Sequence, residues 1–418
     1  MKPSLTFMAI LITVSTATRA QVVPVATGPS GPPVSGTLHY DLRYTQTAQF
    51  YNRSLGDSQR SNVSADLTYA NARATRPFAL TYSGGDSWTI SGANTESGIF
   101  QHLIASQGFL GRAWAFNLSD NVSYVPQAPI TGFSGIPGVG GLPGVPGEPV
   151  QPILTLNTRS IYNLSNANFK HRLDHATTLG ISSNYGILRF PDGNGLETNA
   201  FQAGPQLTMR LNALNSLTSQ YSFSHFSYTA YTITMQTQSS MFGYQRTWSR
   251  RLMTSVSAGP EWVQSSAGSS SPSVGNTIPA TTDLTMNANL TYSNTRKTTA
   301  TLSYIQATNG GAGVPTQIGV RNKDANATFT RQQGKNLTIS FMGAYMRTQG
   351  LQQAGVTNGK VCSVSATRRW GRYIVVFANY SATQQSTSSA LPATAIRGLS
   401  QVVSFGLGYS PLEVRLRK

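Results

Sequence analysis

Residues 283–292 read Asp-Leu-Thr-Met-Asn-Ala-Asn-Leu-Thr-Tyr, and this pattern decides the fold. The even positions, from Leu284 to Tyr292, are apolar or aromatic, whereas the odd positions, from Asp283 to Thr291, are polar. Successive side chains of a β-strand point to opposite faces, so strict alternation predicts a strand with one apolar and one polar face. The same alternation recurs at 38–45, 62–69, 337–345 and 405–409.

The composition fits a chain built from such strands. Only 11% of the 418 residues are charged, against about 25% in an ordinary soluble domain, and only 39% are hydrophobic. Both fractions are low for a cytosolic enzyme, and a helical membrane protein would need runs of about 20 apolar residues. Disorder is also excluded, because disordered chains are poor in aromatic residues and this chain has 18 Tyr, 17 Phe and 5 Trp. The composition is typical of strands that face lipid on one side and water on the other.

The first 20 residues have the layout of a secretory signal peptide. Lys2 precedes an apolar stretch from Leu5 to Val14, and Thr18-Arg19-Ala20 supplies small residues before a cleavage site. We therefore expect residues 1–20 to be removed near Ala20 and residues 21–36 to form a periplasmic N-terminal segment.

Two kinds of connection alternate along the chain. Short basic turns lie near 73–76, 112, 170–172, 210, 246–251, 296–297, 331–335 and 368–372. Longer loops rich in Gly, Ser, Pro and Asn include 84–98, 126–152, 187–197, 264–280, 307–319, 349–359 and 383–397. Eight turns and nine loops join eighteen strands, and sixteen strands are the alternative because the boundaries within 84–112 are indistinct.

The predicted fold is therefore an all-β, transmembrane, antiparallel β-barrel over residues 37–410. Short periplasmic turns, long extracellular loops and an even strand number are the pattern of outer-membrane barrels of Gram-negative bacteria. Residues 411–418 follow as a basic periplasmic tail. A soluble β-sandwich array is the competing fold, but sandwiches do not sort their short and long connections in this way.

Most of the 31 Lys and Arg residues fall in the short turns and in the tail. There they are expected to bind anionic lipid head groups, or to form a positive mouth that attracts anionic solutes or polysaccharides. Nucleic acid is not an expected partner of a secreted chain, despite the net charge of +17. The candidate residues of this basic periplasmic rim are Arg172, Arg246, Arg250, Arg251, Arg296, Lys297, Arg368, Arg369 and Arg372.

The presumed inner faces carry mainly Ser, Thr, Asn and Gln, which predicts a wet and weakly selective interior. A barrel of sixteen to eighteen strands is wide enough for an aqueous channel unless a loop fills it. The candidate pore-lining residues are the longer or charged ones on these faces: Asp41, Arg43, Asp66, Gln206, Arg210, Glu261 and Asp283.

The longest loop has an unusual glycine and proline pattern. Residues 132–149 place glycine at every third position for six triplets, which is the collagen period. Six triplets are too few for a stable triple helix, so we expect an extended polyproline-type loop rather than trimerisation. The sequence is equally consistent with loop 126–152 folding into the pore and with its display outside.

Signals for chemistry are sparse. The five His residues have no metal-ligand spacing, the lone Cys362 excludes an intramolecular disulfide, and no cofactor is expected. His225 and Ser227 lie on one strand face after Tyr221 and Phe223. Outer-membrane phospholipases and lipid A deacylases use a similar His-x-Ser pair with a third polar residue on a neighbouring strand. A lipid hydrolase is therefore the enzymatic alternative to a barrel without catalytic activity.

Four stretches resemble a poorly characterised, porin-like family of Gram-negative outer-membrane β-barrel proteins, some of them encoded with exopolysaccharide systems. These stretches are Trp114–Asp120, Tyr124–Pro129, Gly186–Phe190 and Tyr244–Leu252. The resemblance implies an outer-membrane barrel and, for some members, polysaccharide secretion. Such barrels normally end in an aromatic residue that the barrel assembly machinery reads, and Tyr409 is an internal candidate for that signal.

The sequence thus predicts a passive channel for small solutes or an exported polysaccharide, embedded among outer-membrane lipids. The alternative is a non-transporting surface barrel whose loops bind a partner or exopolysaccharide. Neither the substrate nor the oligomeric state is indicated by the residues.

Overall fold

The computed structural model describes residues 36–51, 57–71, 75–91, 98–125, 159–191, 197–229, 233–267, 280–294, 297–310, 319–334, 336–351, 355–388, 398–411 and 414–415. The expected signal peptide and loop 126–152 lie outside these residues. Within them no helix is long and apolar enough to cross a membrane.

Every regular element of the described chain is a strand. The strands are β1 (Thr37–Tyr51), β2 (Ser58–Asn71), β3 (Phe78–Ser91), β4 (Gly98–Leu110), β5 (Trp114–Val125), β6 (Ser160–Arg172), β7 (Thr177–Arg189), β8 (Thr198–Arg210), β9 (Asn215–Tyr228), β10 (Ile233–Ser249), β11 (Leu252–Ala267), β12 (Thr281–Asn294), β13 (Thr298–Asn309), β14 (Val320–Gln333), β15 (Leu337–Gly350), β16 (Val356–Trp370), β17 (Ile374–Thr387), β18 (Gly398–Tyr409) and the two-residue β19 (Val414–Arg415).

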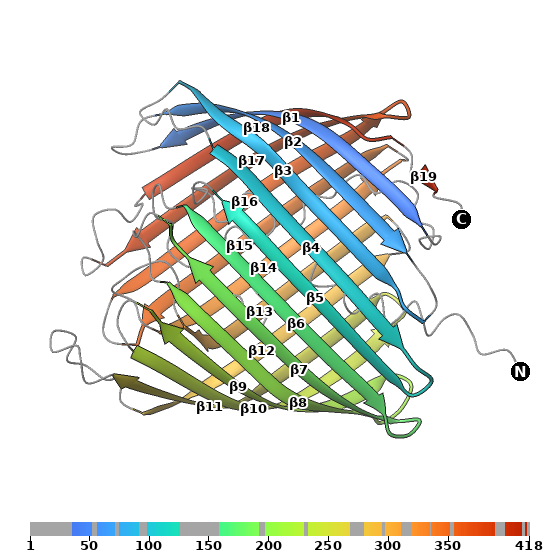
Figure 1. Ribbon diagram of the computed structural model, residues 1–418, viewed down its shortest axis with the longest axis vertical. Coiled ribbons are helices and arrows are strands. Elements are labelled where there is room, and N and C mark those ends of the chain that lie inside the picture. Colours follow the sequence, from blue (N-terminus) through green and yellow to red (C-terminus); the bar gives the residue numbers. More distant parts are fainter. Residues whose placement is uncertain are drawn as a thin grey trace, which may run out of the picture.

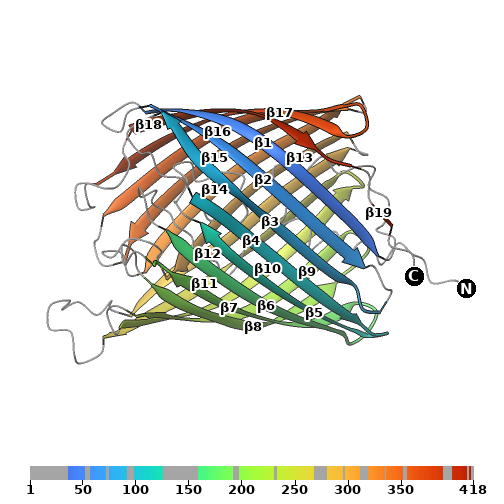
Figure 2. The ribbon, with the colours of Figure 1, turned by 45° about the horizontal axis from the view of Figure 1, so that its top comes forward.

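These strands close into one antiparallel barrel. Each long strand pairs with its neighbours in the sequence, and β18 returns to pair with β1 through Leu42 and Tyr409, so the wall has no free edge (Figures 1 and 2). Closure gives every long strand a hydrogen-bonded neighbour on each side, as a wall in lipid requires. The predicted all-β antiparallel barrel is confirmed, with eighteen long strands rather than sixteen. The short β19 lies beside the start of β1.

The register gives the wall two chemically different faces. On β18 the odd residues Phe405 and Leu407 point outward and are 60% and 55% exposed. Their even neighbours pair with inward residues of β1, such as Ser404 with Thr47. The free Cys362 lies on the outer face of β16, opposite Gly343 of β15. The outer face therefore presents large apolar side chains around the middle of the barrel.

The two ends of the barrel differ in their connections. The start of β1 and the end of β18 lie at the turn end, where eight connections of two to six residues join the strands (Figure 1). Nine connections of four to 34 residues lie at the opposite loop end. Gly334 and Gly371 have φ of 70°, a left-handed conformation that glycine adopts without strain in tight turns.

Asp174 stabilises the short turn between β6 and β7. Its carboxylate accepts hydrogen bonds from the backbone N–H groups of Ala176, at 2.6 Å, and Thr177, at 2.7 Å. These bonds favour the ionised form, and they hold the pKa of Asp174 below its usual value.

Several strands extend further toward the loop end than the sequence predicts. β3 continues through Gly84 and Gly85 to Ser91, β16 begins at Val356 and β17 runs to Thr387, so parts of the expected loops 84–98, 349–359 and 383–397 are strand. On β17 both faces are polar from Thr383 to Thr387, and on β3 Gly84 and Gly85 place glycine on both faces. Alternation then fades although the backbone pairing continues.

Candidate functional site

The inner wall consists mainly of uncharged polar side chains. On β12 the inward residues Asn289 and Thr291 lie opposite Ser303 and Thr301 of β13. Across the next pair, Ser303 lies opposite Asn326 of β14. Hydroxyl and amide groups of this kind bind water and small polar solutes without excluding either sign of charge.

A charged cluster interrupts this neutral surface on β1 and β2. Asp41 is 2% exposed; its carboxylate lies 3.2 Å from His39 Nε2 and 3.3 Å from Arg43 Nη2. The same Arg43 nitrogen lies 3.1 Å from Asp66 Oδ2, and Ser83 of β3 donates a hydrogen bond to Asp66. The structure thus brings together three of the seven candidate pore-lining residues, and one guanidinium links two carboxylates.

The other four candidates are also on inward register positions, but only Glu261 and Asp283 among them lie side by side. Gln206 lies in the middle of β8, and Arg210 ends that strand, where it donates to the carbonyl of Asn212. Glu261 of β11 lies opposite Asp283 of β12 near the loop end. Their role in lining a passage stays a prediction.

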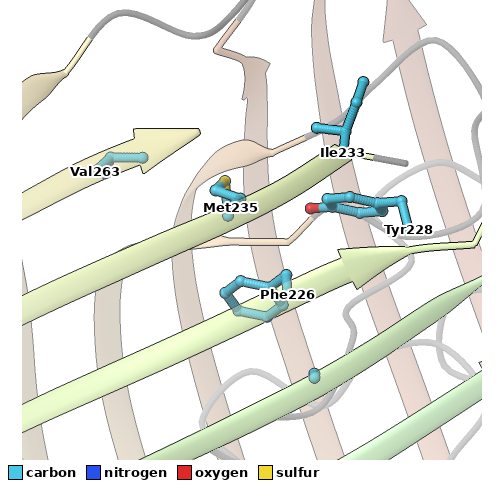
Figure 3. Packing of buried hydrophobic residues seen from close by; sticks show 6 residues of the cluster. Phe226, Tyr228, Ile233, Met235 and Val263 are labelled. Carbon is cyan, nitrogen blue, oxygen red and sulfur yellow. The ribbon is translucent and has the colours of Figure 1, made fainter. Parts of the chain in front are cut away.

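Near the loop end of β8–β11 the inner face is apolar. A buried cluster of Ala200, Phe226, Tyr228, Ile233, Met235 and Val263 gathers there, and Figure 3 shows the last five on three adjacent strands. The outer face at the same level is mainly polar, although it includes Phe201 and Trp262, and Thr234 is hydrogen-bonded there to Ser266 at 2.6 Å. The usual sidedness of the wall is therefore inverted in this region, which requires something inside the barrel to cover the apolar surface.

The hairpin of β13 and β14 supplies part of this cover. Pairing between β12 and β13 ends at Met286 and Gln306, although β12 starts at Thr281. In contrast, β13 remains paired with β14 as far as Asn309 and Val320. The tip of the hairpin thus separates from its neighbour in the wall.

Polar contacts hold this hairpin against the inner face of β11 and β12. The Glu261 carboxyl accepts hydrogen bonds from the Thr308 backbone N–H, at 3.1 Å, and from the Thr308 hydroxyl, at 2.8 Å. Arg321 of β14 forms an ion pair with Asp283 of β12. Because Glu261 and Asp283 point inward, the hairpin tip that they hold, beyond the pair of Gln306 and Lys323, lies on the inner side of the wall.

The tip reaches the inner face of β9. The Tyr228 hydroxyl donates a hydrogen bond to the carbonyl of Gly310, four strands away around the barrel. A Cβ at residue 310 would lie 2.4 Å from Phe226 Cδ1, so only glycine permits this approach. Leu351, just after β15, also packs against the apolar cluster. We call the contacts of Glu261, Asp283, Thr308, Gly310, Arg321 and Tyr228 the loop-end constriction.

The turn end carries the candidate basic rim. Arg172 and Arg369 lie on inner positions and donate to the carbonyls of Arg112 and Ser410. Arg246 and Arg368 lie on outer positions, and the Arg246 guanidinium sits 4.0 Å from the Trp248 ring centroid. The remaining described members lie in turns, namely Arg250, Arg251, Lys297 and Arg372. Arg296 lies outside the described residues.

The arrangement of His225 and Ser227 gives little support to a hydrolase. Both point outward on β9, opposite Gln236 and Thr234 of β10. Among the described residues no hydrogen bond links the two side chains or joins His225 to Gln236, and no Asp or Glu lies opposite either of them. The described residues also contain no cluster of His, Cys, Asp and Glu that could hold a metal ion.

Sequence reasoning missed the apolar inner cluster. The sequence feature that could have revealed it is a change of phase in the apolar pattern of β9, where Tyr221 and Phe223 point outward but Phe226 and Tyr228 point inward. The same shift occurs on β10 between inward Met235 and outward Phe242. A change of phase in an alternating strand predicts apolar contacts inside the barrel.

No protein-family model and no curated protein matches the sequence. Among solved structures, Acinetobacter baumannii OccAB4 is similar over 92% of this chain and 99% of its own, with 8% identity and a TM-score of 0.48. Pseudomonas aeruginosa OccK9 (OpdG) is similar over 91% and 98%, with 8% identity and a TM-score of 0.47. The FrpB iron transporter from Neisseria meningitidis is similar over 91% and 82%, with 8% identity and a TM-score of 0.45. The link to exopolysaccharide systems that the resemblance implies stays a prediction.

Proposed function

We propose that this chain is an outer-membrane channel through which small hydrophilic solutes diffuse. The observation that supports this best is the closed wall of eighteen long strands, apolar outside and lined by uncharged polar groups inside. Lipid would cover the outer face, and water would fill an interior of this strand number. The single guanidinium of Arg43 offsets only part of the charge of Asp41 and Asp66, which favours a weak preference for cations.

The loop-end constriction supports a second feature of the proposed channel. The hairpin of β13 and β14 occupies part of the loop mouth and is held by hydrogen bonds, an ion pair and the apolar cluster. It would limit passage to small solutes while it is docked. Passage of an exported polysaccharide would require this hairpin to move.

Conductance tests the proposal directly. Purified, refolded protein is added to planar bilayers in potassium chloride, with heat-unfolded protein as the control. We expect stepwise insertions with a steady open level and a small preference between potassium and chloride. Folded protein that inserts without any conductance would favour the non-transporting surface barrel.

The range of solutes can be measured in liposomes loaded with a polymer too large to leave. Uncharged sugars of increasing size should cause swelling up to a sharp size limit. A limit that admits long oligosaccharides would favour the polysaccharide passage, whereas a limit near a disaccharide would favour small-solute diffusion.

A further inference from the structure

Three cations gather on the outer face near the loop end, away from the proposed channel. Lys323 of β14, Arg347 of β15 and Lys360 of β16 all occupy outward register positions, and all three are exposed. Each lies within five residues of the loop end of its strand. None of them forms an ion pair with another residue of the described chain.

The register places these cations unusually close together. Lys323 lies directly opposite Arg347, and directly opposed residues in an antiparallel pair have Cβ atoms about 5 Å apart. Arg347 lies opposite Asn358, so Lys360 is its diagonal neighbour, at about 7–8 Å. Like charges in directly opposite positions destabilise a sheet. An anion placed between them would relieve this repulsion.

The surroundings contain no protein group that could act as this anion. The outward residues described on β14, β15 and β16 include no Asp or Glu. By contrast, Arg189, another outward cation near the loop end, lies 3.8 Å from Glu197 and 2.6 Å from Asn199. The three cations therefore form a site whose counter-charge must come from outside the described chain.

The position of the site indicates where that charge comes from. Toward the middle of the barrel the same face is apolar, with Phe329 and Phe341 in ring contact at 6.2 Å. Arg347 follows Phe341 by six residues, or about 20 Å along the strand. Between them the Tyr345 hydroxyl donates to Asn358 at 3.2 Å, as expected of an aromatic residue at a lipid–water boundary. The cations thus lie at the level of lipid head groups.

We propose that Lys323, Arg347 and Lys360 bind the phosphate groups of the phosphorylated glycolipid, lipid A, in the outer leaflet. The proposal rests on the membrane placement proposed above, because only that placement brings the loop end into this leaflet. Phosphate accepts charge-assisted hydrogen bonds from both Lys and Arg, and Arg347 can contact it through two nitrogens. The site would fix one glycolipid against β14–β16.

Binding of lipid A to refolded protein in detergent micelles tests the proposal, with bisphosphorylated and dephosphorylated lipid A compared by native mass spectrometry. The combined variant Lys323→Gln, Arg347→Gln, Lys360→Gln removes the cluster. The variant Arg331→Gln, Arg368→Gln removes cations from the outer face of β14 and β16 at the turn end and is the control. Because each cation near an anionic surface contributes about fivefold, we expect about 100-fold weaker binding for the triple variant and little change for the control.

Equal binding of the two lipids by the wild type, or equal binding by the wild type and the triple variant, would overturn the site. Equal loss in the turn-end control would also overturn it, because net charge would then explain the binding. If the triple variant does not fold, Arg347→Gln alone should weaken binding about fivefold. Conductance in phosphatidylcholine bilayers, which contain no lipid A, tests the channel proposal separately. If the lipid A site is wrong, the protein should still conduct in these bilayers.

Discussion

Replacement of Glu261 by alanine should release the β13–β14 hairpin and make the loop mouth fluctuate. The wild-type carboxyl accepts bonds from both the N–H and the hydroxyl of Thr308, and alanine leaves both donors without this partner. The hairpin keeps its contacts through Gly310 and Arg321. We therefore expect partial undocking rather than loss of the barrel.

The size of the effect follows from the two lost hydrogen bonds. A buried polar group without its partner costs about 1–3 kcal/mol, so two such groups disfavour the docked hairpin by at least about 2 kcal/mol. A change of 2 kcal/mol lowers the ratio of docked to undocked hairpins about 30-fold. Brief visits to a larger conductance level should become correspondingly more frequent.

Single-channel recording measures this ratio as the time spent at each conductance level. Two matched variants isolate the cause. Glu261→Gln keeps one carbonyl oxygen as an acceptor and should give a smaller increase. Ser257→Ala changes an inward residue of β11 four positions from Glu261, toward the turn end, and should not increase the time at the larger conductance level. If Glu261→Ala folds and conducts with wild-type occupancies of both levels, the hairpin does not gate the loop mouth and the reasoning is refuted.

Two further predictions concern the charged cluster and a turn. Arg43→Gln removes the cation between Asp41 and Asp66 and should raise the potassium-to-chloride permeability ratio, which the reversal potential in a salt gradient measures. A unit charge about 8 Å from an ion in water changes the energy of that ion by about 0.5 kcal/mol, with opposite signs for the two ions, so we expect a rise of about fivefold. Arg43→Lys is the control, and an unchanged reversal potential in Arg43→Gln would contradict the inward placement of Arg43. The lowered pKa of Asp174 means that its stabilisation of the β6–β7 turn is present above the ordinary Asp pKa and is lost as the pH falls through the lowered value. Hydrogen exchange at Ala176 and Thr177, relative to intrinsic rates, should therefore accelerate on acidification in the wild type, whereas Asp174→Ala should show fast exchange at every pH.

The strand pattern of this chain can be predicted from its sequence because it is local. Side-chain direction alternates at every residue of a strand, so Leu284 to Tyr292 reveal their shared face without any knowledge of their partners. The outward placement of His225 and Ser227 follows from the same rule. Short turns with charged residues and long loops with Gly and Pro then give the strand number and the two ends of the barrel.

The constriction and the lipid site depend on contacts between residues far apart in the sequence. Tyr228 meets Gly310 because the hairpin of β13 and β14 leaves the wall, and nothing near either residue specifies that departure. Lys323, Arg347 and Lys360 become one cluster only through the register of three strands, since a shift of one residue would send a strand's side chains to the opposite face. Local alternation thus determines which face a residue occupies, whereas strand pairing and hairpin docking determine which residues meet on that face.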